Sequence, residues 1–163
     1  MSYADLERRI QVLEDIEAIK CLKARHYRAV DTQDVELFAS VFTDDAVWES
    51  EPYGRVEGIE GLRALAAAGP ARLTFSVHYV TNAAITVDGD QAVGDWYGLV
   101  ASTLAATGQA AWGAAIVHEE YARVDGSWKI RRFSQVPQFW TPFDTGWAEQ
   151  RFVQSVYGWV ERR

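Results

Sequence analysis

The second half of the chain, from about Leu73 onward, alternates apolar and polar residues with a period of two. This alternation is typical of β-strands. Asp88-Gly89-Asp90, Gly108 and Asp125-Gly126 interrupt it, and such residues favour tight turns. The expected strands are longer than the usual ~5–6 residues, and long strands suit a strongly bent sheet that encloses a cavity. The expected strands cover residues 72–87, 92–105, 110–124 and 127–139.

The first part of the chain has a helical period instead. Apolar residues recur every three or four positions, with charged residues such as Lys23 between them. This pattern predicts an amphipathic helix. Asp31 and the residues after it break the helix, and a second helix begins there. We expect helices over residues 3–42 and 58–68 and a short strand at 45–50. The apolar positions of the first helix are Leu6, Ile10, Leu13, Ile16 and Ile19.

Helices followed by a run of long strands predict an α+β fold. We expect the N-terminal helices to pack in the concave face of a strongly curved antiparallel sheet, as a cone-shaped α+β barrel. With 163 residues, the chain is expected to form a single domain, residues 1–163, with its own core. The segment 144–160 is expected to form a lid or a subunit contact.

The composition indicates an apolar binding site. Hydrophobic residues make up 48% of the chain and aromatic residues 13%. So many aromatic side chains in one small domain indicate a deep apolar pocket, a subunit interface, or both. Simple filling of the core is the alternative for any one of them. A small hydrophobic substrate is therefore the expected partner.

Charge and cysteine content exclude several classes of protein. The net charge of −7, with no basic stripe, argues against nucleic acid as a partner. The one cysteine, Cys21, excludes an internal disulfide and a cysteine-based metal cage. No apolar run is long enough to cross a membrane, and the N terminus is too charged for a signal peptide. We therefore expect a cytoplasmic protein.

Asp31 and His78 are the strongest catalytic candidates. Asp31 lies at the end of the first helix, and His78 lies in an apolar and aromatic run that predicts a strand. If the fold brings them together, the carboxylate fixes the imidazole tautomer and stabilises its charged form, which makes His78 a general base near neutral pH. The alternatives are a core histidine bonded to a backbone carbonyl and a turn aspartate.

His26 and Tyr27 compete for a second role, that of the acid that protonates a leaving hydroxyl or binds a developing oxyanion. Tyr27 precedes Asp31 by four residues, so helical spacing places their side chains on the same face. His26 is adjacent in the sequence. Both residues remain candidates.

Short stretches spread over residues 5–143 carry a likeness to a known family. They are Asp15–Lys20, Leu22-Lys23, Tyr27-Arg28 with Asp31, Phe42–Trp48, His78, Thr81-Asn82, Gly94–Tyr97, Tyr121, Asp125-Gly126 and Trp128–Ile130. Together they resemble SnoaL-like proteins of the nuclear transport factor 2-like superfamily. The resemblance implies the cone-shaped fold but not one particular reaction, because this fold hosts many functions.

The resemblance also implies a cofactor-free lyase. Lyases of this family, which include dehydratases and dehydrochlorinases, are built around an Asp–His pair, and Asp31 and His78 fall where that pair falls. A homotrimer is implied as well. Pocket-lining positions of the family fall on Trp48, Tyr53, Trp96, Ala115 and Val117, and plain core packing is the alternative for each.

The sequence departs from the lyases of this family at two places. Where they have a tyrosine or a lysine five residues before the aspartate, this chain has His26. Where they have a pocket arginine in the last strand, the aligned residues are Pro137 and Phe133, with Arg131 and Arg132 close by. Arg131 and Phe133 are therefore candidate substrate-binding residues, and no relative's substrate is assigned.

No metal or nucleotide cofactor is expected. His26, His78 and His118 lack the close spacing of a zinc motif. His118 is also one residue out of step with the inward-facing Val117, so it should face away from the pocket. The sequence contains no glycine-rich phosphate loop and no G-x-S-x-G elbow.

The leading functional prediction is β-elimination from a small hydrophobic cyclic substrate. His78 would remove a proton from carbon, Asp31 would stabilise the imidazolium, and His26 or Tyr27 would assist the leaving group. An isomerase or cyclase of a steroid or polyketide would use the same base. The third alternative is a non-catalytic binding protein or the small subunit of a ring-hydroxylating oxygenase. The Asp31–His78 pair argues against it, because a scaffold has no use for a buried ionisable pair.

Overall fold

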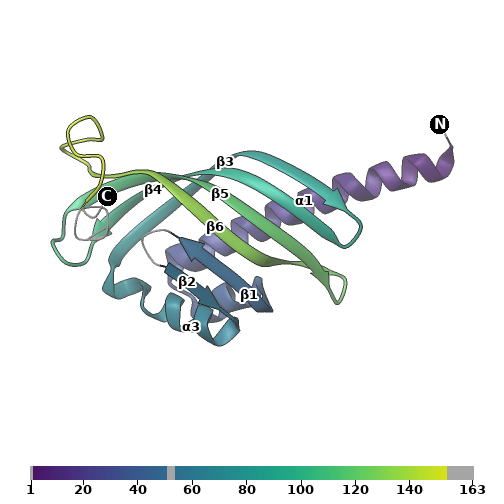
Figure 1. Cartoon of the computed structure of the whole chain (residues 1–163), viewed down its shortest axis with the longest axis horizontal. Helices are drawn as coiled ribbons and strands as arrows, with labels where there is room; N and C mark the ends of the chain where they lie inside the picture. The colour runs from purple at the N-terminus through teal and green to yellow at the C-terminus, as the bar shows by residue number, and fades with distance from the viewer. Residues whose placement is uncertain (1, 51–53, 154–163) are drawn as a thin grey trace.

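The structure, a computed structural model, describes residues 2–50 and 54–153. It begins with a long helix, α1 (Tyr3–Thr32), that runs along a sheet (Figure 1). Ser2 and Asp5 cap its first turn, because each side chain accepts a hydrogen bond from the other residue's backbone N–H. The helix ends at Gln33, whose left-handed backbone closes the last turn. A short helix, α2 (Val35–Ser40), follows.

The sheet contains six strands in the order β2-β1-β6-β5-β4-β3. As expected, β3 to β6 form an antiparallel meander. The elements after α2 are β1 (Phe42–Ser50), β2 (Gly54–Glu57), α3 (Ile59–Ala67), a 3₁₀ turn (Gly69–Ala71), β3 (Leu73–Asp88), β4 (Gln91–Leu104), β5 (Ala110–Val124) and β6 (Ser127–Pro142).

The expected α+β class is confirmed, but the sheet is mixed rather than antiparallel throughout. β1 pairs with β6 in parallel, although the two strands lie at opposite ends of the sequence. The antiparallel partner of β1 is β2, a strand that the sequence did not predict. Parallel neighbours cannot be joined by a hairpin, so local turn residues give no sign of this pairing.

The core lies between α1 and the inner face of the sheet. Asp15 is the first buried residue of α1, whereas Leu6, Ile10 and Leu13, which belong to the apolar positions of the predicted amphipathic helix, are exposed. Figure 1 shows the reason, because the first turns of the helix extend beyond the edge of the sheet. Buried core residues include Ile19, Leu22, Ala29, Phe38, Phe42, Trp48, Val117, Tyr121, Ile130 and Phe133.

The chain after β6 turns back on the sheet. Phe152 forms a parallel bridge with Trp140, and Trp147 packs against the rings of Trp112 and Phe139. Between Asp144 and Val153 the described chain contains turns and no helix. The rest of the segment 144–160, for which we expected a lid or a subunit contact, lies outside the described residues. No helix in the described parts of the chain is long and apolar enough to cross a membrane.

Gly113 packs closely against the indole ring of Trp140. A Cβ at Gly113 would lie 2.8 Å from Cε3 of Trp140, so Gly113→Ala should force the indole ring to move and destabilise the protein by about 1–3 kcal/mol. Gly69→Ala is the matched control, because nothing lies within 4 Å of its added Cβ. Urea unfolding of both variants measures the difference. Equal stability of the two would contradict this packing.

Candidate active site

Asp31 and His78 are in direct contact. His78 Nδ1 lies 2.6 Å from Asp31 Oδ1, and the backbone N–H of His78 donates to Asp31 Oδ2 at 2.9 Å. The hydroxyl of Ser76 donates to Oδ1 at 3.0 Å. The carboxylate is therefore held by two residues of β3.

The local fold explains this contact. β3 is an edge strand, so it has a sheet partner, β4, on one side only. The last turn of α1 places Asp31 against β3, where the carboxylate accepts the N–H of His78. His78 comes from the same strand, two residues after Ser76, so both side chains lie on one face of the sheet.

The electrostatics of Asp31 favour a charged carboxylate. Burial raises the pKa of Asp31, but hydrogen bonds from His78 and Ser76 outweigh it and leave the pKa below its usual value. A carboxylate beside Nδ1 favours the tautomer with the proton on that nitrogen. Nε2 of His78 then carries a free lone pair, as a general base requires.

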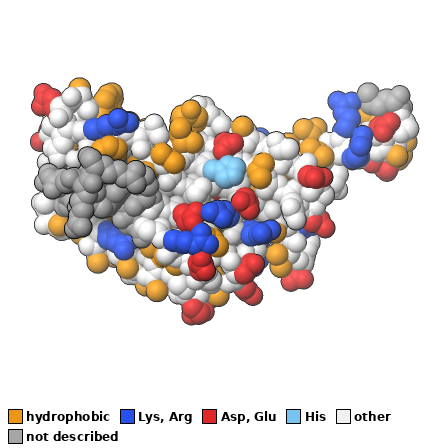
Figure 2. Space-filling view, in the orientation of Figure 1, with side chains coloured by type: hydrophobic (Ala, Val, Ile, Leu, Met, Phe, Trp, Pro, Cys, Tyr) orange, Lys and Arg blue, Asp and Glu red, His pale blue; other side chains and the backbone are white. Residues whose placement is uncertain are grey.

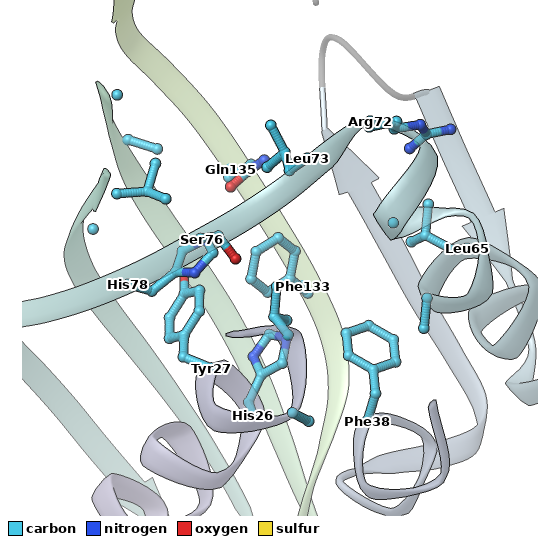
Figure 3. A pocket seen from close by; sticks show the side chains of 18 of the residues that line it. His26, Tyr27, Phe38, Leu65, Arg72, Leu73, Ser76, His78, Phe133 and Gln135 are labelled. Atoms are coloured by element: carbon cyan, nitrogen blue, oxygen red, sulfur yellow. The ribbon is translucent and has the colours of Figure 1, made fainter. Parts of the chain in front are cut away.

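Three rings form a stack on this wall of the site. Tyr27 lies between the imidazoles of His78, with ring centroids 4.7 Å apart, and His26, with centroids 5.0 Å apart. Figure 3 shows the three labelled side chains together, with Phe133 and Phe38 beside His26. The stack joins both candidates for the acid to the Asp31–His78 pair.

The hydroxyl of Tyr27 is available as a hydrogen-bond donor. No other described residue bonds to it, and a Cβ placed on Gly98 would lie 3.7 Å from its oxygen. Burial, followed by the charges of Glu119 and Asp31, raises the pKa of Tyr27 far above its usual value. The phenol therefore stays protonated at neutral pH.

These side chains line a largely apolar cavity of about 190 Å³ (Figure 3). The cavity lies between α1, α3 and the inner face of β3 to β6. Ser76, Gln135 and Arg72 add polar groups to its wall. The other lining residues include His26, Tyr27, Phe38, Trp48, Leu65, Leu73, His78, Val100, Ala115, Phe133 and Trp140.

Some of the expected pocket residues line the cavity, and others lie elsewhere. Trp48, Ala115 and Phe133 line the cavity together with the catalytic candidates. Val117 is fully buried but does not line it. Trp96 lies instead beside a second opening on the other side of Tyr27 and His78. Tyr53 lies outside the described residues.

Arg131, which we expected to bind substrate, does not line this cavity. Its neighbour Ile130 points into the core, and strand alternation therefore turns Arg131 outward to solvent. Arg132 is also held away from the cavity, because it donates to Glu49 at 2.7 Å. His118 is exposed, as expected, and pairs with Asp95.

Sequence reasoning missed a buried ion pair below the ring stack. Nζ of Lys23 donates to Oε1 of Glu119 at 2.7 Å, and both side chains are at most 2% exposed. The hydroxyl of Tyr121 donates to the other oxygen of Glu119, and Trp96 donates to that hydroxyl. The alternation that directs His118 outward also directs Glu119 inward, so this signal was present in the sequence.

No group of three or more His, Cys, Asp or Glu side chains within the described residues could hold a metal ion. The carboxylates of the site already have partners. Asp31 is bonded to His78 and Ser76, and Glu119 is bonded to Lys23 and Tyr121. The site is thus built from acid–base groups around an apolar space.

Comparison with known proteins places this geometry in a family. The model of the SnoaL-like domain matches residues 11–134. The chain belongs to the SnoaL-like family. This finding confirms the resemblance seen in the sequence. A structure of an NTF2-like protein with a cystatin-like fold from Novosphingobium aromaticivorans, 21% identical, shares the fold, with a TM-score of 0.70 over 91% of this chain and 94% of that one.

Several more similar SnoaL-like relatives are dehydrochlorinases. The γ-hexachlorocyclohexane dehydrochlorinase of Sphingobium indicum is 31% identical over 141 residues, which cover 85% of this chain and 88% of the relative. The crystal structure of LinA, also 31% identical, superimposes with a TM-score of 0.77 over 85% of this chain and 93% of that one. The family match, over residues 11–134, includes Tyr27, Asp31 and His78.

Proposed function

We propose that this SnoaL-like protein is a cofactor-independent lyase that catalyses β-elimination from a small cyclic substrate. The observation that carries the proposal is the 2.6 Å contact between Asp31 and His78, because His78 lines an apolar cavity. The similarity to dehydrochlorinases, which are lyases, supports this class of reaction. Asp31, His78 and Tyr27 carry the chemistry.

In the proposed reaction, Nε2 of His78 removes a proton from a carbon atom of the substrate. The electrons of that C–H bond form the new double bond, and the leaving group departs from the adjacent carbon with its own electron pair. Asp31 stabilises the imidazolium through Nδ1. The hydroxyl of Tyr27 donates to the departing hydroxide or halide. His78 later returns its proton to solvent.

The size of the cavity favours a substrate with one ring. A cavity of ~150 Å³ in another protein binds benzene. The cavity here, at about 190 Å³, therefore suits a substituted six-membered ring. A steroid with four fused rings would exceed it. We expect the substrate to be a substituted cyclohexane or cyclohexene rather than a steroid.

A product analysis tests the proposal. The protein would be incubated with hydroxylated and chlorinated cyclohexanes and cyclohexenes, and mass spectrometry would follow the loss of water or HCl. Loss of that mass supports a lyase. Conversion without a change of mass would indicate an isomerase or cyclase instead. Binding without any conversion would indicate a receptor or scaffold.

Tyr27→Phe should lower kcat by about a hundredfold, because it removes a donor to the leaving group. The aromatic ring and its stack with His78 remain, so KM should change little. Tyr79→Phe is the control, because Tyr79 is 58% exposed and does not line the cavity. Steady-state kinetics measure both variants. An unchanged kcat in Tyr27→Phe would show that Tyr27 is not the donor to the leaving group.

We also propose that the protein is a homo-oligomer, with a trimer favoured. Tyr97, Ile116 and Val136 are adjacent in register across β4, β5 and β6 and are 37–57% exposed. Phe75 and Tyr79 of β3 are exposed as well. Figure 2 shows hydrophobic side chains at the surface of one face of the molecule and on the projecting end of α1. Apolar surface of this kind marks protein–protein contacts.

Ile116→Asp should dissociate this oligomer, because it places a charge in the middle of the apolar row. Thr107→Asp, in the exposed turn between β4 and β5, is the control. Sedimentation velocity gives the mass of each variant. A wild-type protein that sediments as a monomer would refute the proposed oligomer.

A further inference from the structure

The two ring nitrogens of His26 have different surroundings. The side chain is 2% exposed and lines the cavity. Its Nδ1 is enclosed and has no hydrogen-bond partner. The nearest carboxylate oxygen, Oε1 of Glu119, lies 3.7 Å away, beyond hydrogen-bond distance. Nε2 is therefore the nitrogen through which His26 can contact a ligand in the cavity.

Charged and titratable groups approach His26 from three elements. Glu119 lies on β5, His78 on β3, and Lys23 and Tyr27 on α1. The side chains from α2, β1 and β6 that contact the imidazole are phenylalanines, which carry no charge: Phe38, Phe42 and Phe133.

Glu119 is the negative charge beside His26. Burial raises the pKa of Glu119, but the ammonium of Lys23 outweighs it and lowers that pKa to about 2. Burial also lowers the pKa of His26, against the attraction of Glu119, and the charge of Lys23 adds to the lowering. The imidazole is therefore neutral, with its proton on one nitrogen. A carboxylate beside Nδ1 favours the proton on that nitrogen rather than on Nε2.

We propose that His26 presents an unprotonated Nε2 to the cavity and accepts a hydrogen bond there from a hydroxyl group of the substrate. Lys23 and Glu119 act as positioning residues. Lys23 donates to Oε1 of Glu119 at 2.7 Å, and burial, together with the charge of Lys23, lowers the pKa of His26, which keeps the imidazole neutral. Glu119 holds the proton on Nδ1. The inference deepens the proposed function, on which it rests, by naming a hydroxylated ring as the substrate class.

The stack of rings places His26 and Tyr27 where both can bind the same substrate oxygen. His26 and Tyr27 are parallel neighbours, with ring centroids 5.0 Å apart, and both line the cavity. A hydroxyl group can donate one hydrogen bond and accept two. The same substrate oxygen can therefore donate to His26 and accept from Tyr27. A chlorine substituent cannot donate a hydrogen bond, so a hydroxyl group is the substituent that fits this corner of the cavity.

Nitrogen NMR of the imidazole rings tests the tautomer without a substrate. The chain contains three histidines, and a His118→Asn variant removes the exposed one, which simplifies the assignment. We expect His26 to show a protonated Nδ1 and an unprotonated Nε2 at neutral pH. In Lys23→Met/Glu119→Gln, which removes both charges, the Nε2-protonated form should increase. A wild-type His26 that is protonated on Nε2, or on both nitrogens, would refute the proposal.

Matched ligands test the hydrogen bond itself. Cyclohexanol and chlorocyclohexane differ in one substituent, so the ratio of their dissociation constants isolates the hydroxyl group. We expect His26→Phe to weaken cyclohexanol binding about three- to tenfold and to leave chlorocyclohexane binding unchanged, as loss of one neutral hydrogen bond requires. Equal losses for both ligands would mean that His26 only packs, and would overturn the inference.

Circular dichroism would check that the variant folds, and His26→Leu would replace it if it does not. Neither the NMR nor the binding measurement depends on turnover. A negative product analysis combined with the expected tautomer and binding ratio would therefore refute the proposed lyase while leaving the hydroxyl site in place. Loss of water or HCl in the product analysis, without the expected tautomer and binding ratio, would support the lyase but reject the hydroxyl site.

Discussion

Replacing His78 with alanine is expected to lower kcat by at least about a hundredfold, because general base catalysis typically contributes about 10²–10⁴. The side chain lies at the wall of the cavity and is 16% exposed, so its loss should leave the fold intact. Binding of the apolar ring depends on the rest of the wall, and KM should change little. Kinetics on a substrate found by product analysis measure the effect.

Asp31→Asn should cause a loss of similar size through a different route. An amide cannot stabilise the imidazolium, and its NH₂ group would face the N–H of His78 or its Nδ1–H. The imidazole would then change tautomer or turn away. If this variant kept wild-type turnover, the carboxylate would have no part in the reaction.

The surface of the protein offers a matched control for this experiment. His118 and Asp95 form a second imidazole–carboxylate contact at 2.8 Å, with side chains 46% and 62% exposed. His118→Ala removes the same kind of pair outside the cavity and should leave kcat unchanged. Equal effects of His78→Ala and His118→Ala would show that the first loss is not specific to the site.

Lys23→Met is expected to destabilise the fold by about 3–5 kcal/mol, because it leaves the carboxylate of Glu119 buried without its cation. For a domain of this size, such a loss lowers Tm by roughly 10 °C. The double variant Lys23→Met/Glu119→Gln removes both charges and keeps an acceptor for Tyr121, so it should recover most of the stability. A single variant within about 1 kcal/mol of wild type would contradict the buried ion pair.

The same pair predicts how stability depends on pH. The pKa of Glu119 is lowered from 4.5 to about 2 in the folded protein. A lowered pKa means that the unfolded chain binds a proton first as pH falls. The stabilisation by Glu119 is therefore complete above its usual pKa and is lost as pH falls toward 2. Urea unfolding over this range should show a steeper fall in stability for the wild type than for the double variant, which keeps the lowered pKa of Asp31.

Much of the fold follows from periodicity in the sequence. The alternation after Leu73 and the turn residues between strands predict β3 to β6, and the helical period predicts α1. The parallel pairing of β1 with β6 does not follow, because it joins segments far apart in the chain without a turn between them. The exposure of Leu6, Ile10 and Leu13 depends on where the sheet ends, which no local pattern records.

The candidate site was partly accessible from the sequence for similar reasons. Asp31 and His78 stood out as charged or titratable residues at the end of a helix and in an apolar strand, and the fold brings them together. Lys23 looked like one of several surface charges on α1, and only the packing of that helix against β5 shows that it is buried with Glu119. Arg131 was expected in the pocket because it is close in sequence to Phe133, but the alternation of β6 turns its side chain outward.

The position of His78 on an edge strand links the site to the dynamics of the fold. Its backbone N–H would face solvent, or the edge of another sheet, if Asp31 did not accept it. Amide hydrogen exchange at His78 therefore reports whether the last turn of α1 is docked on β3. A local opening there would expose an edge available for intermolecular strand pairing and would separate the carboxylate from the imidazole in the same event. Protection from aggregation and assembly of the Asp31–His78 pair thus depend on the same docking of α1 on β3.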